Sequence, residues 1–308
     1  MRLPLLILAA LSVPWWFVSC GSNKLPPIGS AGAENPKATA LFQEAKQAEQ
    51  AGKTKKAVKL YDELADEYPL VPQAPEARFR QAQLLEQRGK TLKAFEAYQD
   101  FISRYRGSNL YEKALSRQAR MAQGAADGEI KTSFLGLKSN LPTDKVVEML
   151  EKVRDNAPAA PSASKAQFSI GALYQSKGKP ADAIKAFREL VFKFPDSPEA
   201  PEGQFRIGVI LTDEAKEGNQ DKANLDMARE AFKDYLLRYP GHSKNAEAHQ
   251  RIKKLGYQDI QRSYDVAEFY LKKGDTESAK IYFREVLDKA KSGPLYNKAK
   301  ARLAELGE

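Results

Sequence analysis

A repeat with a period of 37 residues constrains the fold of this chain more than any other feature of its sequence. Gly52 and Gly89 are 37 residues apart, and each is followed five residues later by an alanine and nine residues later by a tyrosine. A small residue followed one helical turn later by an aromatic one lets two helices approach closely, because the ring fills the space beside the small side chain. The period therefore predicts a stack of helical hairpins, each packing only on its neighbours.

The best-preserved copy of the repeat runs from Ala166 to Pro195. Its small and apolar residues recur at helical spacing in two runs, which are separated by the segment 177–180. Gly178 in this segment favours the end of a helix, since glycine adopts the left-handed conformation without strain. Pro195 marks the end of the second helix, because the residue before a proline is driven out of the helical region. The copy therefore predicts a helical hairpin.

Less regular units lie on both sides of this copy. The third unit is eroded, with an insertion at 127–142 between its two helices, and the fifth is lengthened at 214–224. Residues 245–255 form either a further helix or an extension of the sixth hairpin. Residues 295–306 are typical of a capping helix with a charged face, which a solenoid needs at its end.

The repeat resembles the tetratricopeptide repeat, which has small residues at positions 8 and 20, aromatic residues at 11 and 24, and proline at 32. The fourth unit carries this pattern at Gly171, Tyr174, Ala183, Phe187 and Pro195. The resemblance implies an all-α fold, a right-handed α-solenoid of about five to six tetratricopeptide-like helical hairpins with a C-terminal capping helix. The segments that we expect are a signal peptide at 1–19, an acylated cysteine and flexible tether at 20–36, N-terminal repeats at 37–158, and C-terminal repeats with the cap at 159–308.

The N-terminus has the character of an export signal. A positive Arg2 precedes an apolar run from Leu3 to Val18, which is shorter than the ~20 residues of a membrane-spanning helix. The run ends at Ser19-Cys20, and a small residue directly before a cysteine resembles the bacterial lipoprotein signal. That resemblance implies cleavage before Cys20 and acylation of the new terminus, so Cys20 is the expected lipidation site. An ordinary secretory signal or a membrane helix with an incidental cysteine is the alternative.

Composition and charge exclude some classes of function. Hydrophobic residues make up 42% of the chain and charged residues 29%, a balance typical of globular proteins. The net charge is +9, but the basic residues are interspersed with acidic ones and form no run of five or more. Because nucleic-acid binding needs a clustered basic stripe, we expect no nucleic-acid partner.

Residues that carry chemistry are few. Cys20 is the only cysteine, and His242 and His249 are the only histidines. This excludes an internal disulfide and leaves too few ligands for a zinc site without carboxylates. The many carboxylates interleave with lysine and arginine, as on solvated helix faces. We therefore expect no enzyme, no metal, no cofactor and no small-molecule substrate. An enzyme whose site lies in the insertions at 127–142 and 214–224 is the alternative.

One row of residues is a candidate peptide-binding groove. Aligned units place an aromatic residue at the same point of the first helix in five of them: Phe42, Phe79, Phe168, Phe205 and Tyr264. In tetratricopeptide arrays the first helices line the concave groove, where such a row would suit an extended, partly apolar peptide. The residue before the ring is polar in four of the five units, which favours the alternative that the rings pack between helices. The two interpretations stay open at this point.

The whole arrangement resembles the BamD family of outer-membrane lipoproteins, which belong to the machinery that inserts β-barrels into the outer membrane. The resemblance rests on the expected lipid anchor, the short tether, the repeats and three C-terminal segments, AEFYLKKG at 267–274, YFREVL at 282–287 and KAKARLAEL at 298–306. It implies a scaffold anchored at the periplasmic face of the outer membrane, with a barrel-assembly subunit and unfolded outer-membrane proteins as partners. A generic tetratricopeptide lipoprotein scaffold for envelope or division complexes is the alternative.

Overall fold

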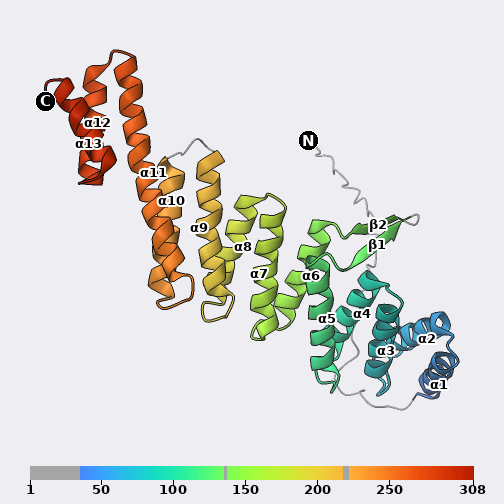
Figure 1. Cartoon of the computed structure of the whole chain (residues 1–308). Helices are drawn as coiled ribbons and strands as arrows, with labels where there is room; N and C mark the ends of the chain where they lie inside the picture. The colour runs from blue at the N-terminus through green and yellow to red at the C-terminus, as the bar shows by residue number, and fades with distance from the viewer. Residues whose placement is uncertain (1–34, 135–136, 218–221) are drawn as a thin grey trace, which may run out of the picture.

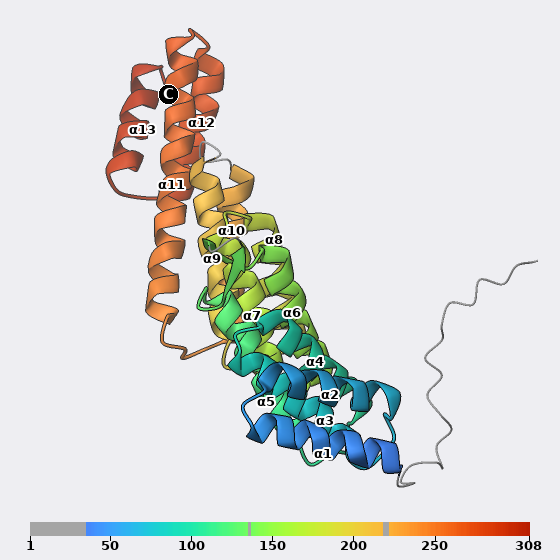
Figure 2. The same ribbon diagram turned by 90° about the vertical axis from the view of Figure 1, so that its right-hand side faces the viewer.

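The computed structural model describes residues 35–134, 137–217 and 222–308. In these residues the chain forms thirteen α-helices and one two-stranded β-hairpin. The helices are stacked into an elongated array that runs from α1 at one end to α13 at the other (Figures 1 and 2). The expected all-α solenoid is confirmed. The predicted signal peptide, Cys20 and most of the tether lie outside the described residues.

The helices of the N-terminal part are α1 (Pro36–Gln50), α2 (Thr54–Glu67), α3 (Ala74–Gln87), α4 (Thr91–Arg104), α5 (Tyr111–Ala126) and α6 (Thr143–Asn156). Strands β1 (Lys131–Phe134) and β2 (Leu137–Asn140) lie between α5 and α6. The C-terminal part has α7 (Pro161–Ser176), α8 (Pro180–Lys193), α9 (Ala200–Glu217), α10 (Lys222–Arg238), α11 (Asn245–Lys272), α12 (Thr276–Ala290) and α13 (Pro294–Glu305). Within these described residues, no helix combines the length and the apolar character needed to cross a membrane.

Consecutive helices pair as the period predicts, α1 with α2, α3 with α4, and so on along the chain. The first helices of neighbouring hairpins also contact each other, as α5 does α7 and α7 does α9. The repeat alanines and aromatic residues lie where two helices meet, and Ala183 and Phe187 of the best-preserved unit are fully buried. Gly178, between α7 and α8, has a φ of +64°, the left-handed conformation that its place at the turn requires.

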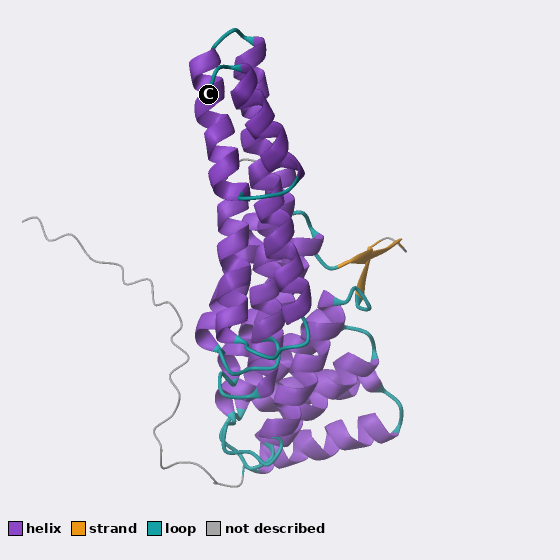
Figure 3. Ribbon diagram, turned by 60° about the vertical axis from the view of Figure 1, so that its left-hand side comes forward, coloured by secondary structure: helices purple, strands orange, loops and turns teal. Residues whose placement is uncertain are grey.

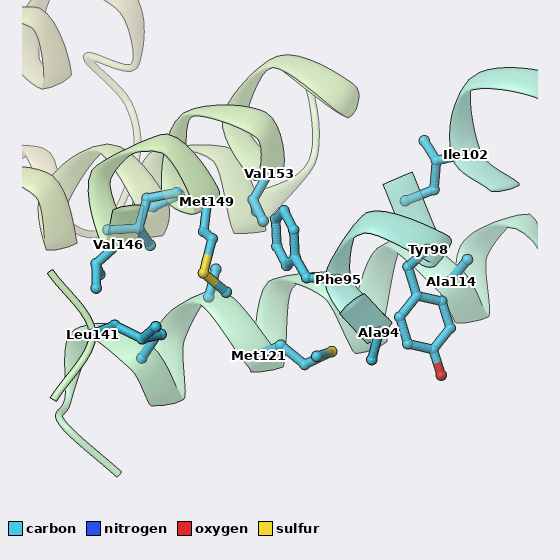
Figure 4. Close-up of a cluster of buried hydrophobic side chains, with 14 of the residues drawn as sticks. Ala94, Phe95, Tyr98, Ile102, Ala114, Met121, Leu141, Val146, Met149 and Val153 are labelled. Carbon is cyan, nitrogen blue, oxygen red and sulfur yellow. The ribbon is translucent and has the colours of Figure 1, made fainter. Parts of the chain in front are cut away.

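The eroded third unit keeps a hydrophobic core although its sequence departs from the repeat. Side chains of α4, α5 and α6 meet in one cluster that includes Phe95, Met121, Met149 and Val153 (Figure 4). Leu141, at the end of the insertion, is buried in the same cluster. Packing between neighbouring units is therefore continuous through this part of the array.

The insertion at 127–142 contains a β-hairpin that the repeat pattern does not predict. Strands β1 and β2 are antiparallel, with Lys131 opposite Asn140 and Phe134 opposite Leu137. The hairpin projects from the side of the helical array (Figure 3). It is too short to form a sheet with a core of its own, and it leaves the all-helical packing of the array unchanged.

The C-terminal end settles one open alternative. Residues 245–255 belong to a single 28-residue helix, α11, so they extend the first helix of the last hairpin. The predicted capping helix is present as α13, and its Leu295, Ala299 and Leu303 are buried against a cluster that includes Phe283 of α12. Helix α13 thereby covers the apolar side of the last hairpin.

Candidate protein-binding face of the first helices

The five predicted groove residues all lie on first helices, one each on α1, α3, α7, α9 and α11. Phe42, Phe79 and Phe205 are buried, whereas Phe168 and Tyr264 are only partly buried. These side chains therefore do not form an uninterrupted exposed aromatic row. Their role in binding a peptide stays a prediction.

Each of the five rings contacts an aromatic ring on the second helix of its own hairpin. Phe168 lies 5.6 Å from Phe187 between ring centroids, and Phe205 lies 5.3 Å from Phe232. The other three pairs are Phe42 with Tyr61, Phe79 with Tyr98, and Tyr264 with Phe283. Most of these contacts have edge-to-face geometry, which is favourable between aromatic rings. The rings therefore pack the two helices of each hairpin together.

Four of these rings also carry a cationic group on another side. The guanidinium of Arg206 lies 5.0 Å from the ring centroid of Phe168, and the ammonium of Lys244 lies 4.7 Å from that of Phe205. Lys113 approaches Phe79 in the same way. In these three cases the cation belongs to the next unit, so cation–π contacts link neighbouring hairpins. Lys46 lies over Phe42 within α1.

A groove on the first-helix face of the C-terminal half, here called the inner groove, has a cavity volume of about 450 Å³. Its lining comes from α7, α9 and the start of α11. Glu202 in this groove accepts hydrogen bonds from Lys244, at 2.5 Å, and from Arg206, at 3.0 Å. Burial alone would raise the pKa of Glu202, but these two cationic donors outweigh it and the pKa is lowered. The inner groove therefore holds a fixed, ion-paired carboxylate beside Phe205.

A second cavity on the same face, of about 690 Å³, lies between α3 and the loop that leads into α5. Phe79, Arg80, Tyr105 and Lys113 are among its lining residues. This lining combines aromatic rings with charged groups, and the inner groove likewise has a ring, Phe205, beside charged groups. Two of the five predicted aromatic residues, Phe79 and Phe205, therefore line cavities, while their rings also pack against second helices.

The polar residue directly before the aromatic ring has a structural role that the sequence does not reveal. These residues, Arg78, Gln167, Gln204 and Ser263, are all buried. The amide of Gln167 donates to the carbonyl oxygen of Ala186 on α8, and that of Gln204 donates to Ala231 on α10. The polar residue therefore bonds to the second helix from inside the array. Its recurrence at one repeat position is the signal that could have revealed this role.

Candidate catalytic and metal-binding residues do not converge in the described part of the chain. The imidazole of His242 is hydrogen-bonded to the hydroxyl of Tyr235 at 2.6 Å, and His249 is exposed on α11. In the ranges that the structure covers, no group of three or more histidine, cysteine or acidic side chains could hold a metal ion. The arrangement on the first helices is one of packing and surface contact.

Residues 138–305 match a protein family described as YfiO, outer membrane lipoprotein, and residues 42–109 match a tetratricopeptide-repeat family. The first match spans more than half of the chain. This chain belongs to the YfiO family of outer membrane lipoproteins. No match was found among curated proteins. The family and the repeats together make the chain a tetratricopeptide-type protein-interaction scaffold.

Solved structures similar to this YfiO-family chain are tetratricopeptide proteins. A tetratricopeptide repeat protein from Parabacteroides merdae is 15% identical, with 88% of this chain and 98% of that chain covered and a TM-score of 0.30. PilF of Pseudomonas aeruginosa is 13% identical, with 86% and 96% covered and a TM-score of 0.31. The tetratricopeptide domain of P58(IPK) is 14% identical, with 86% and 77% covered and a TM-score of 0.35.

Proposed function

We propose that this protein is a non-enzymatic scaffold at the periplasmic face of the outer membrane, where it binds partner proteins during the assembly of β-barrel outer-membrane proteins. The match of residues 138–305 to the YfiO outer membrane lipoproteins is the observation that carries this proposal. The BamD-like segments at 267–274 and 282–287 lie within that range, and the one at 298–306 ends one residue beyond it. Tetratricopeptide arrays generally act by binding, and the proposal includes no catalytic step.

The two halves of the array would bind different partners. The C-terminal hairpins would dock the periplasmic domains of the barrel-forming subunit, as the resemblance to the BamD family implies. The N-terminal hairpins would receive an extended segment of an unfolded outer-membrane protein. The cavity of about 690 Å³ beside Phe79 is large enough for side chains of such a segment, and its mixed lining suits a partly apolar peptide.

Acylation of Cys20 would hold the scaffold at the membrane. Each buried methylene of an acyl chain contributes about 0.8 kcal/mol, so several chains on one residue anchor a protein firmly. In a cell-fractionation experiment, Cys20→Ala should release the protein from the membrane into the periplasm. Unchanged membrane association of the Cys20→Ala protein would contradict the lipid anchor.

Affinity purification of the tagged full-length protein from detergent-solubilised membranes tests the proposed partners. We expect recovery of an outer-membrane barrel protein that carries several periplasmic domains. The acylated protein should be used, since its orientation at the membrane decides which domains it can reach. Recovery of cell-division or peptidoglycan proteins without such a barrel would contradict the proposal.

That last result would favour the second candidate function, a general scaffold for envelope complexes. The N-terminal part of the chain supports this candidate, because residues 42–109 match tetratricopeptide repeats in general. The β-hairpin at 131–140 also lies before most of the residues that match the YfiO family. A different partner set could therefore use the N-terminal half.

A further inference from the structure

Each first helix packs against the second helix of its own hairpin and against that of the preceding hairpin, as α3 does against α4 and α2. The space that such a set of three helices borders on the side of the second helices is here called an outer groove. In the groove formed by α2, α3 and α4, the buried guanidinium of Arg78 fills this space. It contacts Asp62 at 2.6 Å, Asp100 at 2.8 Å and also Asp66. Arg104 of α4 contacts Asp100 at 2.7 Å. Ion pairs therefore close this first outer groove.

The next two outer grooves are also bridged by polar groups. Between α4, α5 and α6, the amide of Gln118 donates to Gln99 at 2.7 Å, and Asn156 donates to both glutamines. Between α6, α7 and α8, Arg154 donates to Gln167 at 2.8 Å. Gln167 in turn donates to Glu189 of α8 at 3.3 Å. Each network joins two second helices through the first helix below them.

The outer groove of α8, α9 and α10 lacks such a network. The residues that would build it can be identified by counting from the repeat alanines, Ala57 in α2 and Ala183 in α8. Arg188 takes the place of Asp62, Phe192 that of Asp66, and Gln204 that of Arg78. Gln204 is buried, and its amide donates to the carbonyl oxygen of Ala231. The groove therefore lacks the central cation of the first one and the two carboxylates that α2 contributes there, Asp62 and Asp66.

As a consequence this groove is open, with a cavity volume of about 500 Å³. Its apolar lining consists of Val191, Phe192, Ile207, Leu211, Met227 and Ala231. The side chain of Phe192 is 83% exposed, and that of Met227 is 45% exposed. Burial of such side chains by a partner would remove a large apolar area from water.

The exposed phenylalanine is not a requirement of the repeat. The equivalent positions in four other hairpins carry polar residues: Asp66, Ser103, Asp155 and Asp288. Only the fifth hairpin resembles the fourth, with Leu237 at this position and 80% exposed. An exposed aromatic side chain at position 192 therefore calls for a reason beyond the stability of the array.

Some charged side chains on the rim of the groove have no partner among the described residues. Asp234 and Arg238 of α10 occupy the positions of Asp100 and Arg104 in the first groove. Within the residues that the structure describes, the side chains of these two residues and of Arg188 on α8 make no hydrogen bond and no ion pair. The other two carboxylates of the rim are already paired, Asp226 with Arg229 and Glu230 with Lys233. Two free arginines against one free aspartate favour a negatively charged occupant.

We propose that the outer groove of α8, α9 and α10 is a docking site for a segment of a partner protein that supplies a large apolar side chain flanked by carboxylates. The apolar side chain lies against Phe192 and Met227, and the carboxylates pair with Arg188 and Arg238. A buried apolar anchor with a charged rim is the usual arrangement of an energetically dominant contact. The site lies on the opposite side of the hairpins from the inner groove and does not depend on the proposed role in barrel assembly.

Fluorescence anisotropy with labelled synthetic peptides tests the proposal on the full protein. The panel consists of 15-residue peptides with leucines at helical or at alternating spacing, each made with glutamate and with lysine at the flanking positions. We expect at least one glutamate peptide to bind saturably, and its lysine counterpart to bind at least about tenfold more weakly. Phe192→Asp should weaken binding of the glutamate peptide by about tenfold or more, because it removes the apolar anchor. Ile281→Asp, at a residue 60% exposed on α12, is the matched control and should bind normally.

A triple variant, Arg188→Asp, Phe192→Asp and Gln204→Arg, transfers the ion-pair network of the first groove into this one. It should fold, since the first groove already contains these residues in the same fold, and it should no longer bind the glutamate peptide. If no glutamate peptide binds saturably, the proposal is overturned. Equal binding of the peptide by the wild type and by the folded triple variant would overturn it too. Self-association of the wild type that Phe192→Asp abolishes would also overturn it, because the occupant would then be a second copy of the chain.

Discussion

Arg78 connects three helices through one buried guanidinium group. It is 4% exposed and bonds carboxylates on α2 and α4 as well as the amide oxygen of Gln81 on its own helix. Burial by itself would lower the pKa of Arg78, but the charges of Asp100, Asp66 and Asp62 more than offset this and raise it. Arg78 therefore stays charged, and its positive charge compensates the negative charges of the carboxylates around it.

Replacement of this arginine by an apolar residue of similar length should destabilise the N-terminal hairpins. Arg78→Met leaves Asp100 partly buried without its main cation. We expect the free energy of unfolding to fall by roughly 2–3 kcal/mol. This is less than the full cost of a buried unpaired charge, because Asp62 and Asp66 can be hydrated. Urea denaturation measures this loss. Arg80→Met, at a more exposed arginine of the same helix, is the control. Equal stability of the Arg78→Met and Arg80→Met variants would show that the ion pairs of Arg78 do not stabilise the fold.

Gly171 shows how closely the helices of one hairpin approach. A Cβ atom at this position would lie 2.6 Å from the ring of Phe187, whereas one at Gly256, within α11, would meet no atom within 4 Å. Both glycines lie inside helices and neither has a positive φ. The same substitution at the two positions should therefore have opposite effects.

Gly171→Ala should destabilise the protein by about 1–3 kcal/mol, because the fully buried ring of Phe187 has to move. Gly256→Ala should stabilise it by about 0.5–1 kcal/mol through the better helix propensity of alanine. Thermal denaturation of the two variants beside the wild type measures both effects. A stabilising effect of Gly171→Ala would mean that α7 and α8 lie farther apart than in this structure.

Helix α11 illustrates what the sequence can and cannot predict at the scale of elements. The hairpins are predicted well because small and aromatic residues such as Gly171 and Phe187 have to recur wherever two helices touch. The sequence does not show that residues 245–255 and the first helix of the last hairpin form one continuous helix. Helical spacing alone does not reveal whether one helix ends before another begins. The β-hairpin at 131–140 is not predicted because it lies in an insertion, where the repeat pattern is interrupted.

The candidate binding site, too, can be predicted from the sequence only in part. The positions of the five aromatic residues on first helices follow from the period, but their exposure depends on side chains of the neighbouring units. Arg206 and Lys244 cover Phe168 and Phe205 from the next hairpin, and the alignment of single units cannot show such contacts. The open outer groove likewise becomes visible only when the ion pairs of Arg78 are known.

Glu202 links α9 to the start of α11, and its ion pairs should make this contact pH-dependent. The pKa of Glu202 is lowered from its usual 4.5. The ion pairs of Glu202 therefore contribute fully to stability above pH 4.5, and this contribution is lost as the pH falls through the lowered pKa. Glu202→Gln should therefore reduce stability at pH 7, by up to about 1 kcal/mol for this partly exposed group. The difference from the wild type should shrink at pH 3. Thermal denaturation at both pH values measures it.

The control for this effect is Glu230→Gln on α10. Glu230 also pairs with a lysine, Lys233, but both side chains are more than half exposed. Solvent screens such a pair, so this variant should match the wild type at both pH values. A Glu202→Gln variant with an unchanged difference at pH 3 would show that packing, rather than the carboxylate charge, holds α11 to α9.

Across the whole molecule, the array presents two different sides. The first helices carry the inner groove and the cavity beside Phe79, while the second helices carry outer grooves of which the one beside Phe192 is open. Because each hairpin packs mainly on its neighbours, surface residues of one unit can change without disturbing the others. The hairpins α7–α8 and α9–α10 thus combine a core typical of the repeat with an unusual surface.

Depletion of the protein from cells, followed by quantification of outer-membrane proteins, tests the proposed role most directly. If the protein is a scaffold in barrel assembly, the amounts of many different β-barrel proteins in the outer membrane should fall together. The amounts of unrelated outer-membrane lipoproteins, which need no barrel insertion, should stay constant. Unchanged levels of β-barrel proteins after complete depletion would contradict the role in barrel assembly.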